Sequence, residues 1–219
     1  MVGNGQLALN DATEWLGDFH PLAEQLGSAD GLVTLGSVSS RLRLPPVRDT
    51  ATLQRLLRDY QARILIPIEM PAIRAAHSHA LGQELAELIE LDRRLAEEPL
   101  LGFFAEPSRR IGRYQLQKLR PLRDLRILRR YLCAVESAQA NGWHTLVYGL
   151  TLAIYSLPLQ QGLLGYAHQT TRGLIYTAAR MLRLSEHECR DLFDETCAPL
   201  PEVVSSLLRP EPAARPEPH

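Results

Sequence analysis

The sequence predicts an all-α protein, folded as a single-domain bundle of roughly eight to ten helices. Apolar residues recur at i, i+3 and i+4 along most of the chain, which is the spacing that places them on one face of a helix. Stretches in which apolar and polar residues alternate, as they do in strands, are almost absent. Proline and glycine fall mostly between the helical stretches, where they end one helix and allow the next to begin.

Composition and charge are those of an ordinary globular protein. The chain has 219 residues, of which 45% are hydrophobic and 22% charged, so one domain with a sizeable core is expected. The formal net charge of −1 gives no reason to expect nucleic acid or a membrane as a partner. The most apolar run, TLVYGLTLAIYSLPL, is shorter than the roughly 20 residues of a membrane span and contains Pro158, so we predict that it is core.

The cysteines and the first residues bear on location. The three cysteines form no CxxC, which suits a reducing cytosol better than a secreted disulfide framework. Cys133, between Leu132 and Ala134, is predicted to be a small core residue. The first residues lack a basic region followed by an apolar one, so no signal peptide is expected and a cytoplasmic location is predicted.

We divide the chain into a flexible N-terminus, residues 1–10, a helical domain, residues 11–208, and a tail, residues 209–219. The tail is rich in proline and has little to bury, so it is expected to be disordered alone. Residues 12–26 predict a weak first helix. Residues 27–46 contain glycine, serine and proline throughout and are expected to form a long irregular segment, of a length that usually indicates function or disorder.

Capping residues and prolines mark the later helices. Asp49 or Thr50 can cap the helix that begins there. Pro67 and Pro71 are expected to interrupt the helical pattern, because proline lacks the N–H that a helix interior needs. A loop is expected over residues 99–107. The predicted helices cover residues 51–65, 71–81, 83–97, 107–119, 122–140, 144–156, 158–183, 185–197 and 201–208.

No motif of a familiar active site or metal site is present. The sequence lacks the glycine-rich phosphate and dinucleotide loops, the nucleophile elbow of hydrolases and the HExxH metal motif. His77 and His79 come nearest to a metal pair, but residues i and i+2 of a helix point about 200° apart, so one helix cannot chelate through both. We therefore predict no catalytic, metal-binding or cofactor-binding residue and no cofactor, although ligands that converge in space or across a dimer would escape this argument.

The helix predicted over 158–183 has two different sides. Its apolar side, which is expected to face the core, consists of Leu163, Ala167, Thr170, Leu174, Ala178 and Met181. Its polar side includes Gly165, His168, Gln169, Arg172, Tyr176 and Arg180. A general base at His168 would need a positioned partner and a pocket, and the sequence supplies neither. Arginine and tyrosine are enriched at protein interfaces, so the polar side favours an interaction surface, with a solvated face as the open alternative for any single residue.

Four segments, taken in order, carry a family resemblance. They are LPPVRDTATLQRLLRDYQARILIPIEMPAIRAA, ELAELIELDRRLAEE, PSRRIGRYQLQKL and HTLVYGLTLAIYSLPLQQGLLGYAHQTTRGLIYTAARMLRLSEHE. The third contains the serine, glycine and arginine of a family motif, here Ser108, Gly112 and Arg113, and the fourth has a central glycine, Gly149. Over about residues 25–208 the chain resembles the urease accessory proteins of type F, which are all-helical nickel-insertion chaperones.

Two segments depart from that family's pattern. In LVTLGSVSSRLR, Ser37, Ser39 and Leu42 match, but an aromatic pair is missing and Arg43 stands where the family has an acid. After the long helix, RLSEHECRDLF replaces a PLGQTDGQ-like loop. Because the family uses these segments for partner contact, the resemblance implies the fold more firmly than it implies the same partners.

The resemblance implies a non-enzymatic adaptor. Such a protein would form a homodimer, bridge a second accessory protein, a nickel-carrying GTPase and apo-urease, and couple GTP hydrolysis to nickel delivery. Its partner-binding residues would be Ser37, Ser39, Arg43, His168, Gln169, Arg172, Tyr176 and Arg180. Two alternatives stay open: a divergent helical scaffold that serves another metalloenzyme, and an enzyme with an unrecognised site.

Overall fold

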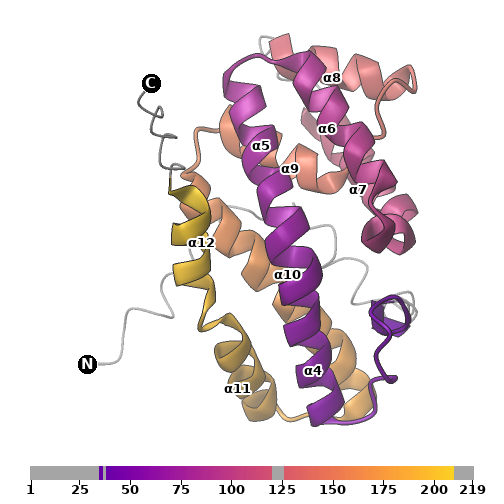
Figure 1. Cartoon of the computed structure of the whole chain (residues 1–219), viewed down its shortest axis with the longest axis vertical. Helices are drawn as coiled ribbons and strands as arrows, with labels where there is room; N and C mark the ends of the chain where they lie inside the picture. The colour runs from indigo at the N-terminus through magenta and orange to yellow at the C-terminus, as the bar shows by residue number, and fades with distance from the viewer. Residues whose placement is uncertain (1–34, 37, 120–125, 210–219) are drawn as a thin grey trace, which may run out of the picture.

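The computed structural model describes residues 35–36, 38–119 and 126–209 (Figure 1). Every regular element in these residues is helical, which confirms the predicted all-α, single-domain bundle. The N-terminus predicted to be flexible, the weak helix predicted over 12–26 and nearly all of the Pro-rich tail lie outside the described residues. Within the described part, no helix is both long enough and apolar enough to cross a membrane.

Three consecutive elements form one continuous rod that runs most of the length of the molecule in Figure 1. They are α4 (Thr50–Tyr60), η2 (Gln61–Glu69) and α5 (Met70–Leu81). Asp49 caps the rod, as predicted, because its side chain accepts a hydrogen bond from the Thr52 N–H at 2.8 Å. The buried face of its first part consists of Leu53, Leu56, Leu57, Tyr60 and Ile64.

The prediction that Pro67 and Pro71 interrupt this helix is wrong. A π-helical stretch, η2, carries the chain past Pro67, and the N–H of Met70 donates to the carbonyl of Leu65, five residues earlier. The wider turn of a π-helix gives the proline ring room that an α-helical turn would deny it. Pro71 follows in the first turn of α5, so the two predicted helices are one rod.

Four shorter elements follow the rod (Figure 1); the first of them packs on α5, and the others pack on one another. They are α6 (Leu85–Glu97), η3 (Pro99–Phe104), α7 (Ala105–Leu119) and α8 (Arg126–Glu136). The loop expected over 99–107 is therefore wrong: this stretch is a 3₁₀ helix and the first turn of α7. Glu98 stabilises its start, since the Glu98 side chain accepts a hydrogen bond from the Leu100 N–H at 3.1 Å.

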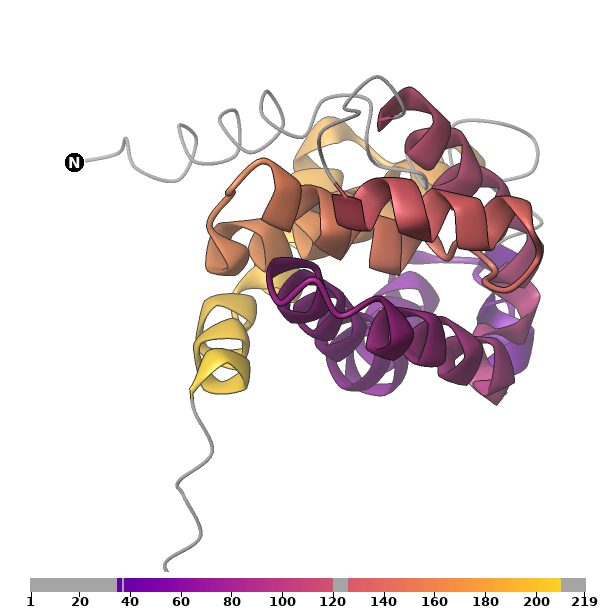
Figure 2. The same ribbon diagram turned by 90° about the horizontal axis from the view of Figure 1, so that it is seen from above.

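The interior helix is α9 (His144–Ile154), in which every residue from His144 to Ala153 is buried. It packs side by side with α5 (Figure 2). A Cβ atom on Gly149 would lie 2.4 Å from the carbonyl oxygen of Ile73, so only glycine allows the two backbones to approach this closely. The apolar run that the sequence predicted to be core is thus core as far as Ala153, whereas Tyr155 is 48% exposed and Pro158 is exposed.

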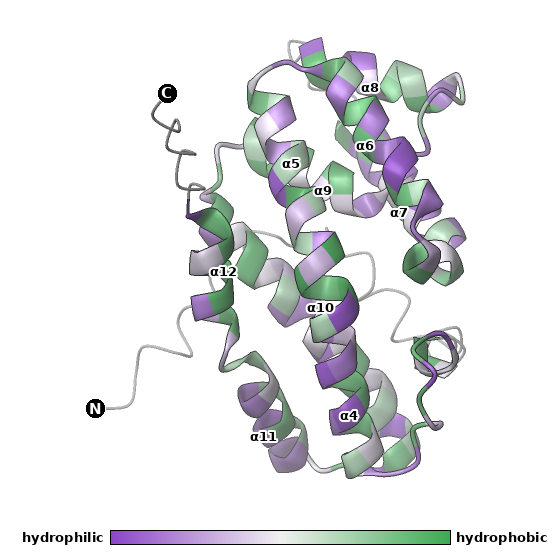
Figure 3. Cartoon of the chain, viewed as in Figure 1, coloured by the Kyte–Doolittle hydropathy of each residue, from purple (hydrophilic) through white to green (hydrophobic). Residues whose placement is uncertain are grey.

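The C-terminal helices are α10 (Leu159–Leu182), α11 (Glu186–Cys197) and α12 (Leu200–Leu208). Both α11 and α12 pack on α10. Ser185 and Glu188 form a capping box that begins α11. Purple hydrophilic and green hydrophobic residues alternate around α11, as expected for a helix with one face on the bundle (Figure 3).

Two smaller expectations fail in the described part of the chain. Residues 35–36 and 38–41 are helical, although they belong to the stretch expected to be irregular. Cys133, expected in the core, is exposed on α8, because its neighbours Leu132 and Ala134 take the buried positions of that helix.

Candidate partner-binding site

Helix α10 has a buried side that matches the prediction with two corrections. Its buried members include Leu163, Ala167, Thr170, Leu174 and Ala178. Met181 is 45% exposed, because it lies in the last turn of α10, at the end of the covered part of the helix. Gly165, placed on the polar side by its sequence position, is buried inside the bundle and is not available for the approach of another chain.

The outer side of α10 presents an arginine and a tyrosine one turn apart. The Arg172 guanidinium lies over the Tyr176 ring, 5.8 Å from its centroid, in a cation–π arrangement. The Tyr176 side chain is 53% exposed, which is high for so large an aromatic residue. Arg180, one further turn along, is also exposed. An exposed Arg–Tyr pair on a rigid helix has the chemistry of a protein-binding surface.

His168 and Gln169 do not share that open surface. The His168 ring packs edge-on against Phe193 of α11, with 5.5 Å between ring centroids, and burial lowers its pKa. Gln169 is half-buried, and its Oε1 has no hydrogen-bond partner among the described residues. The structure therefore brings Arg172, Tyr176 and Arg180 together on the surface and places His168 and Gln169 at the edge of the bundle.

A chain of buried hydrogen bonds, which the sequence did not reveal, fixes α10 within the bundle. His144 lies at its centre, with Nδ1 2.6 Å from Oγ of Ser108 and Nε2 2.7 Å from the hydroxyl of Tyr166. The Tyr166 hydroxyl donates to Oε1 of Glu69 at 3.1 Å. The Tyr60 hydroxyl donates to Oε2 of Glu69 at 2.8 Å. These contacts join α4, η2, α7, α9 and α10, and we call them the buried polar chain.

Burial shifts the pKa values of the titratable groups in the buried polar chain, and it raises those of Tyr60 and Tyr166 well above their usual range. Burial also acts on Glu69 and His144. It raises the pKa of Glu69 to about 7, although the hydrogen bonds from Tyr60 and Tyr166 act to lower it. It lowers the pKa of His144 to about 4, so the imidazole is neutral at physiological pH. When both tyrosines donate to Glu69, the Tyr166 oxygen accepts from Nε2–H of His144, and Ser108 donates to Nδ1. Each group then has a partner, as a structural network requires.

The buried polar chain is closed to solvent. Glu69 is 2% exposed, His144 5% and Tyr166 0%. A substrate could not reach these groups without local unfolding, so they position helices and do not form an active site.

A second buried carboxylate, Asp92, holds the loop between α8 and α9. Its Oδ2 accepts from the Tyr131 hydroxyl at 2.6 Å and from the Gly142 N–H at 2.9 Å, and its Oδ1 accepts from the Asn141 N–H at 2.6 Å. A Cβ atom on Gly112 of α7 would lie 2.0 Å from the Gly142 carbonyl oxygen. The aspartate of the segment ELAELIELDRRLAEE and the glycine of the serine–glycine–arginine segment thus serve the framework of the fold.

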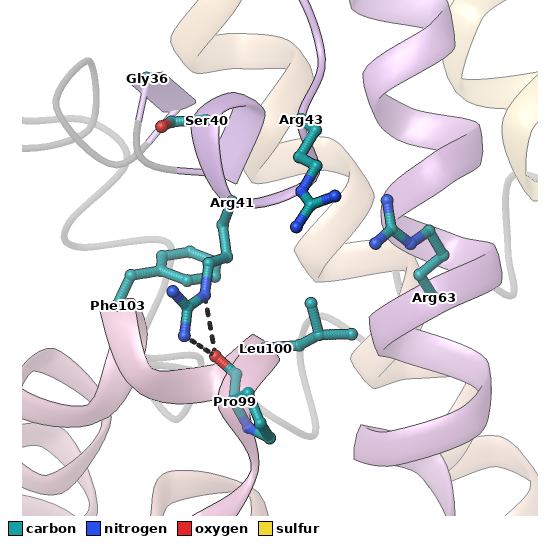
Figure 4. A pocket seen from close by; sticks show the side chains of 8 residues that line it. All are labelled: Gly36, Ser40, Arg41, Arg43, Arg63, Pro99, Leu100 and Phe103. Carbon is teal, nitrogen blue, oxygen red and sulfur yellow. Dashed lines mark hydrogen bonds between the residues drawn. The ribbon is translucent and has the colours of Figure 1, made fainter.

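The three N-terminal residues predicted to bind partners lie in different places. Ser37 is outside the described residues. Ser39 is only 3% exposed, and its Oγ has no hydrogen-bond partner in the described part of the chain. Arg43 is exposed and lines a surface pocket together with Arg41 and Arg63 (Figure 4), neither of which the sequence singled out.

Metal-ligating side chains are scattered. Among the residues that the structure describes, no group of three or more histidines, cysteines, aspartates or glutamates could hold a metal ion. Nδ1 of His79 lies 2.7 Å from Oε2 of Glu84, at the C-terminal end of α5, whereas His77 is half-buried and its burial lowers its pKa.

Comparisons with known proteins point to one family. The family model UreF matches residues 47–194, which extend from just before α4 into α11. A urease accessory protein UreF from Actinobacillus pleuropneumoniae serotype 3 (strain JL03) is 22% identical over 205 residues, covering 94% of this chain and 85% of the relative. A urease accessory protein UreF from serotype 5b (strain L20) of the same species is 20% identical with the same coverage.

Proposed function

The chain belongs to the UreF family of urease accessory proteins, and from this membership we propose that it is an adaptor in urease maturation. In this role it bridges a second accessory protein, a nickel-carrying GTPase and apo-urease, and it links GTP hydrolysis to the delivery of nickel. We propose that it acts as a homodimer in the cytosol.

One observation carries the proposal: the family match spans 47–194 and therefore includes the rod, the buried polar chain and all of α10. Members of the family are non-catalytic accessory proteins, so the chain is not an enzyme. This removes the alternative of an unrecognised active site. The remaining alternative is a scaffold of the same family that has been redirected to another metalloenzyme.

The outer side of α10 is our candidate for the main partner contact. Arg172, Tyr176 and Arg180 lie on a helix that the buried polar chain fixes from behind. A rigid helix presents its side chains with little loss of conformational freedom on binding, and arginine and tyrosine are frequent binding hot spots. His168, which packs against Phe193 of α11, lies on the same helix as this surface.

Mixing experiments test the adaptor role. The purified chain is incubated with the GTPase and the second accessory protein encoded beside a urease of the same organism, and the mixture is analysed by gel filtration and by GTP hydrolysis. We expect co-elution and a changed hydrolysis rate, with no turnover of GTP by the chain alone. A chain that elutes separately and leaves the rate unchanged would contradict the proposal, and binding to a different metalloenzyme would favour the redirected scaffold.

A further inference from the structure

A surface pocket of about 790 Å³ opens at the N-terminal end of the described chain, and none of its lining residues belongs to α10 (Figure 4). Its walls come from the helical turn over residues 38–43, from η2 and from η3. The lining residues are Gly36, Ser40, Arg41, Arg43, Arg63, Pro99, Leu100 and Phe103. We call this the arginine pocket.

The arginine pocket concentrates positive charge that the described residues do not neutralise. Arg41 donates from Nε to the carbonyl oxygen of Pro99 at 2.8 Å, and Arg63 donates from Nη1 to the carbonyl oxygen of Leu42 at 2.9 Å. Both acceptors are neutral. The Arg43 guanidinium makes no hydrogen bond to any described residue, and none of these arginines forms an ion pair with a described carboxylate.

The backbone directs Arg43 into the pocket. Arg43 has a φ of 57°, in the left-handed region that favours glycine. This residue ends the short helix: its N–H donates to the Ser40 carbonyl at 3.0 Å, and the Leu44 N–H donates to the Ser39 carbonyl at 2.8 Å. Glycine is the usual residue at such a helix end. Because the backbone conformation of Arg43 is fixed, so is the direction in which its side chain leaves the backbone. In Figure 4 the Arg43 and Arg63 side chains extend toward one another across the pocket.

An apolar wall lies next to these charges. Pro99 and Leu100 of η3 line the same pocket, and Leu100 is half-buried, so its side chain offers further surface to bury. A single small oxyanion would leave this wall and most of the volume unused. A peptide that carries carboxylates next to an apolar side chain would use both, since guanidinium groups bind carboxylates in pairs of parallel hydrogen bonds.

We propose that the arginine pocket is a docking site for an acidic segment of a partner protein. Arg43 and Arg63 bind its carboxylates, and an apolar side chain of the same segment packs on Leu100. The pocket is built from residues other than those of the outer side of α10, so this inference goes beyond the proposed function and stands or falls separately from it. Docking at two separate places would give the adaptor two contacts with its assembly.

Fluorescence anisotropy with a defined probe tests the proposal. The probe is a dye-labelled octapeptide of glutamates with two leucines, and its matched control has glutamines in place of the glutamates. We expect the full chain to bind the probe at low ionic strength and to bind the control at least tenfold more weakly. Arg43→Glu should weaken probe binding at least tenfold, whereas Arg129→Glu, at an exposed arginine of α8, makes the same change of net charge and should weaken it less than threefold.

Two results would overturn the proposal: no binding of the probe by the parent chain, or equal losses for Arg43→Glu and Arg129→Glu. Thermal melts show whether each variant is folded. If Arg43→Glu fails to fold, Arg63→Gln takes its place, because it removes the charge and keeps a polar side chain at this exposed position of η2. Probe binding by a folded Arg63→Gln equal to that of the parent would then overturn the proposal.

The chain's own N-terminal residues are the competing occupant. Residues 1–34 contain no lysine or arginine, and their acidic residues are Asp11, Glu14, Asp18, Glu24 and Asp30. A photo-cross-linking amino acid in place of Leu100 of the full chain distinguishes the two cases. We expect cross-links to the added probe. Cross-links to residues 1–34 of the same chain that the probe does not reduce would assign the pocket to this segment and overturn docking by a partner.

Discussion

The buried polar chain and the arginine pocket use polar side chains in opposite ways. Inside the bundle, Ser108, His144, Tyr166, Glu69 and Tyr60 satisfy one another, with every contact between 2.6 and 3.1 Å. In the pocket, the three arginines donate to neutral carbonyl groups or to none of the described residues. The first arrangement is closed to solvent and the second is open.

This difference distinguishes polar residues that stabilise the fold from polar residues that are available to bind a partner. A buried polar group without a partner costs free energy, so an interior network is stable only when it is complete. An exposed charge stays hydrated, so it costs little while unpaired and remains available to a partner. We therefore assign the buried polar chain to the stability of the bundle, and the arginine pocket and the outer side of α10 to recognition.

The largest expected effect comes from breaking the buried polar chain. Tyr166→Phe removes the hydroxyl that joins His144 to Glu69 and leaves both without that partner. We expect a loss of about 2–5 kcal/mol in the free energy of unfolding, since each unsatisfied buried group costs about 1–3 kcal/mol. Denaturant unfolding measures it. The matched control is Tyr155→Phe, at a tyrosine that is 48% exposed, and equal effects of the two changes would contradict the assignment.

The second effect is a pH dependence. The pKa of Glu69 rises from 4.5 in the unfolded chain to about 7 in the folded one. Between pH 4.5 and 7, therefore, the folded chain keeps a proton on Glu69 that the unfolded chain has released. The stability contributed by this group is fully present below pH 4.5 and is lost as the pH rises to about 7. Glu69→Gln removes this loss, so its stability relative to the parent should increase by up to about 3 kcal/mol between pH 4.5 and 7.

Unfolding of both chains over this pH range checks the prediction. His144 titrates in the opposite sense, because its pKa is lowered to about 4, but it is present in both chains and its effect largely cancels in the difference. A difference between Glu69→Gln and the parent that does not change with pH would show that Glu69 has an ordinary pKa.

A smaller and different effect is expected on the outer side of α10. Arg172→Ala and Tyr176→Ala should change the free energy of unfolding by no more than about 0.5 kcal/mol, because both side chains are exposed. Each should weaken association with a partner by more than about 1 kcal/mol if it is a hot spot. Arg93→Ala, at an exposed arginine of α6, is the control. Pull-downs with each accessory protein measure the effect, and binding equal to that of the parent would reduce this side to a solvated face.

The smallest expected effect is at Arg43, where one substitution should raise the stability of the chain and weaken its binding of the acidic probe. Arg43→Gly relieves the left-handed backbone and should raise the free energy of unfolding by up to about 1 kcal/mol. The same change removes a guanidinium from the arginine pocket and should weaken binding of the acidic probe. Thermal melts and anisotropy measure the two quantities. A chain that is both less stable and equally able to bind would contradict our account of this residue.

The helical periodicity was sufficient to predict most of the fold. Apolar spacing located the helices from α4 to α12, and Asp49 marked the start of the rod. The rule that proline ends a helix failed at Pro67, because a π-helical turn has room for the ring and periodicity at 3.6 residues does not reveal such a turn. Periodicity and the proline rule describe α-helices, whereas the rod contains a π-helical stretch.

The sites were harder to predict because their residues are far apart in the sequence. The buried polar chain joins residues from 60 to 166, and each member alone resembles an ordinary polar residue of an amphipathic helix. Arg43 attracted notice as a departure from a family pattern, but its pocket needs Arg63, which belongs to η2. Only the packing of these segments brings the side chains together.

The central claim is that this chain is an adaptor in urease maturation, and the nickel content of urease tests it most directly. Apo-urease and the other accessory proteins are produced in one host, with the parent chain, with the Arg172→Ala/Tyr176→Ala double variant or without the chain. We predict nickel-loaded, active urease with the parent, little without the chain, and a reduced amount with the double variant although it is folded. Equal nickel content with and without the chain would contradict the account.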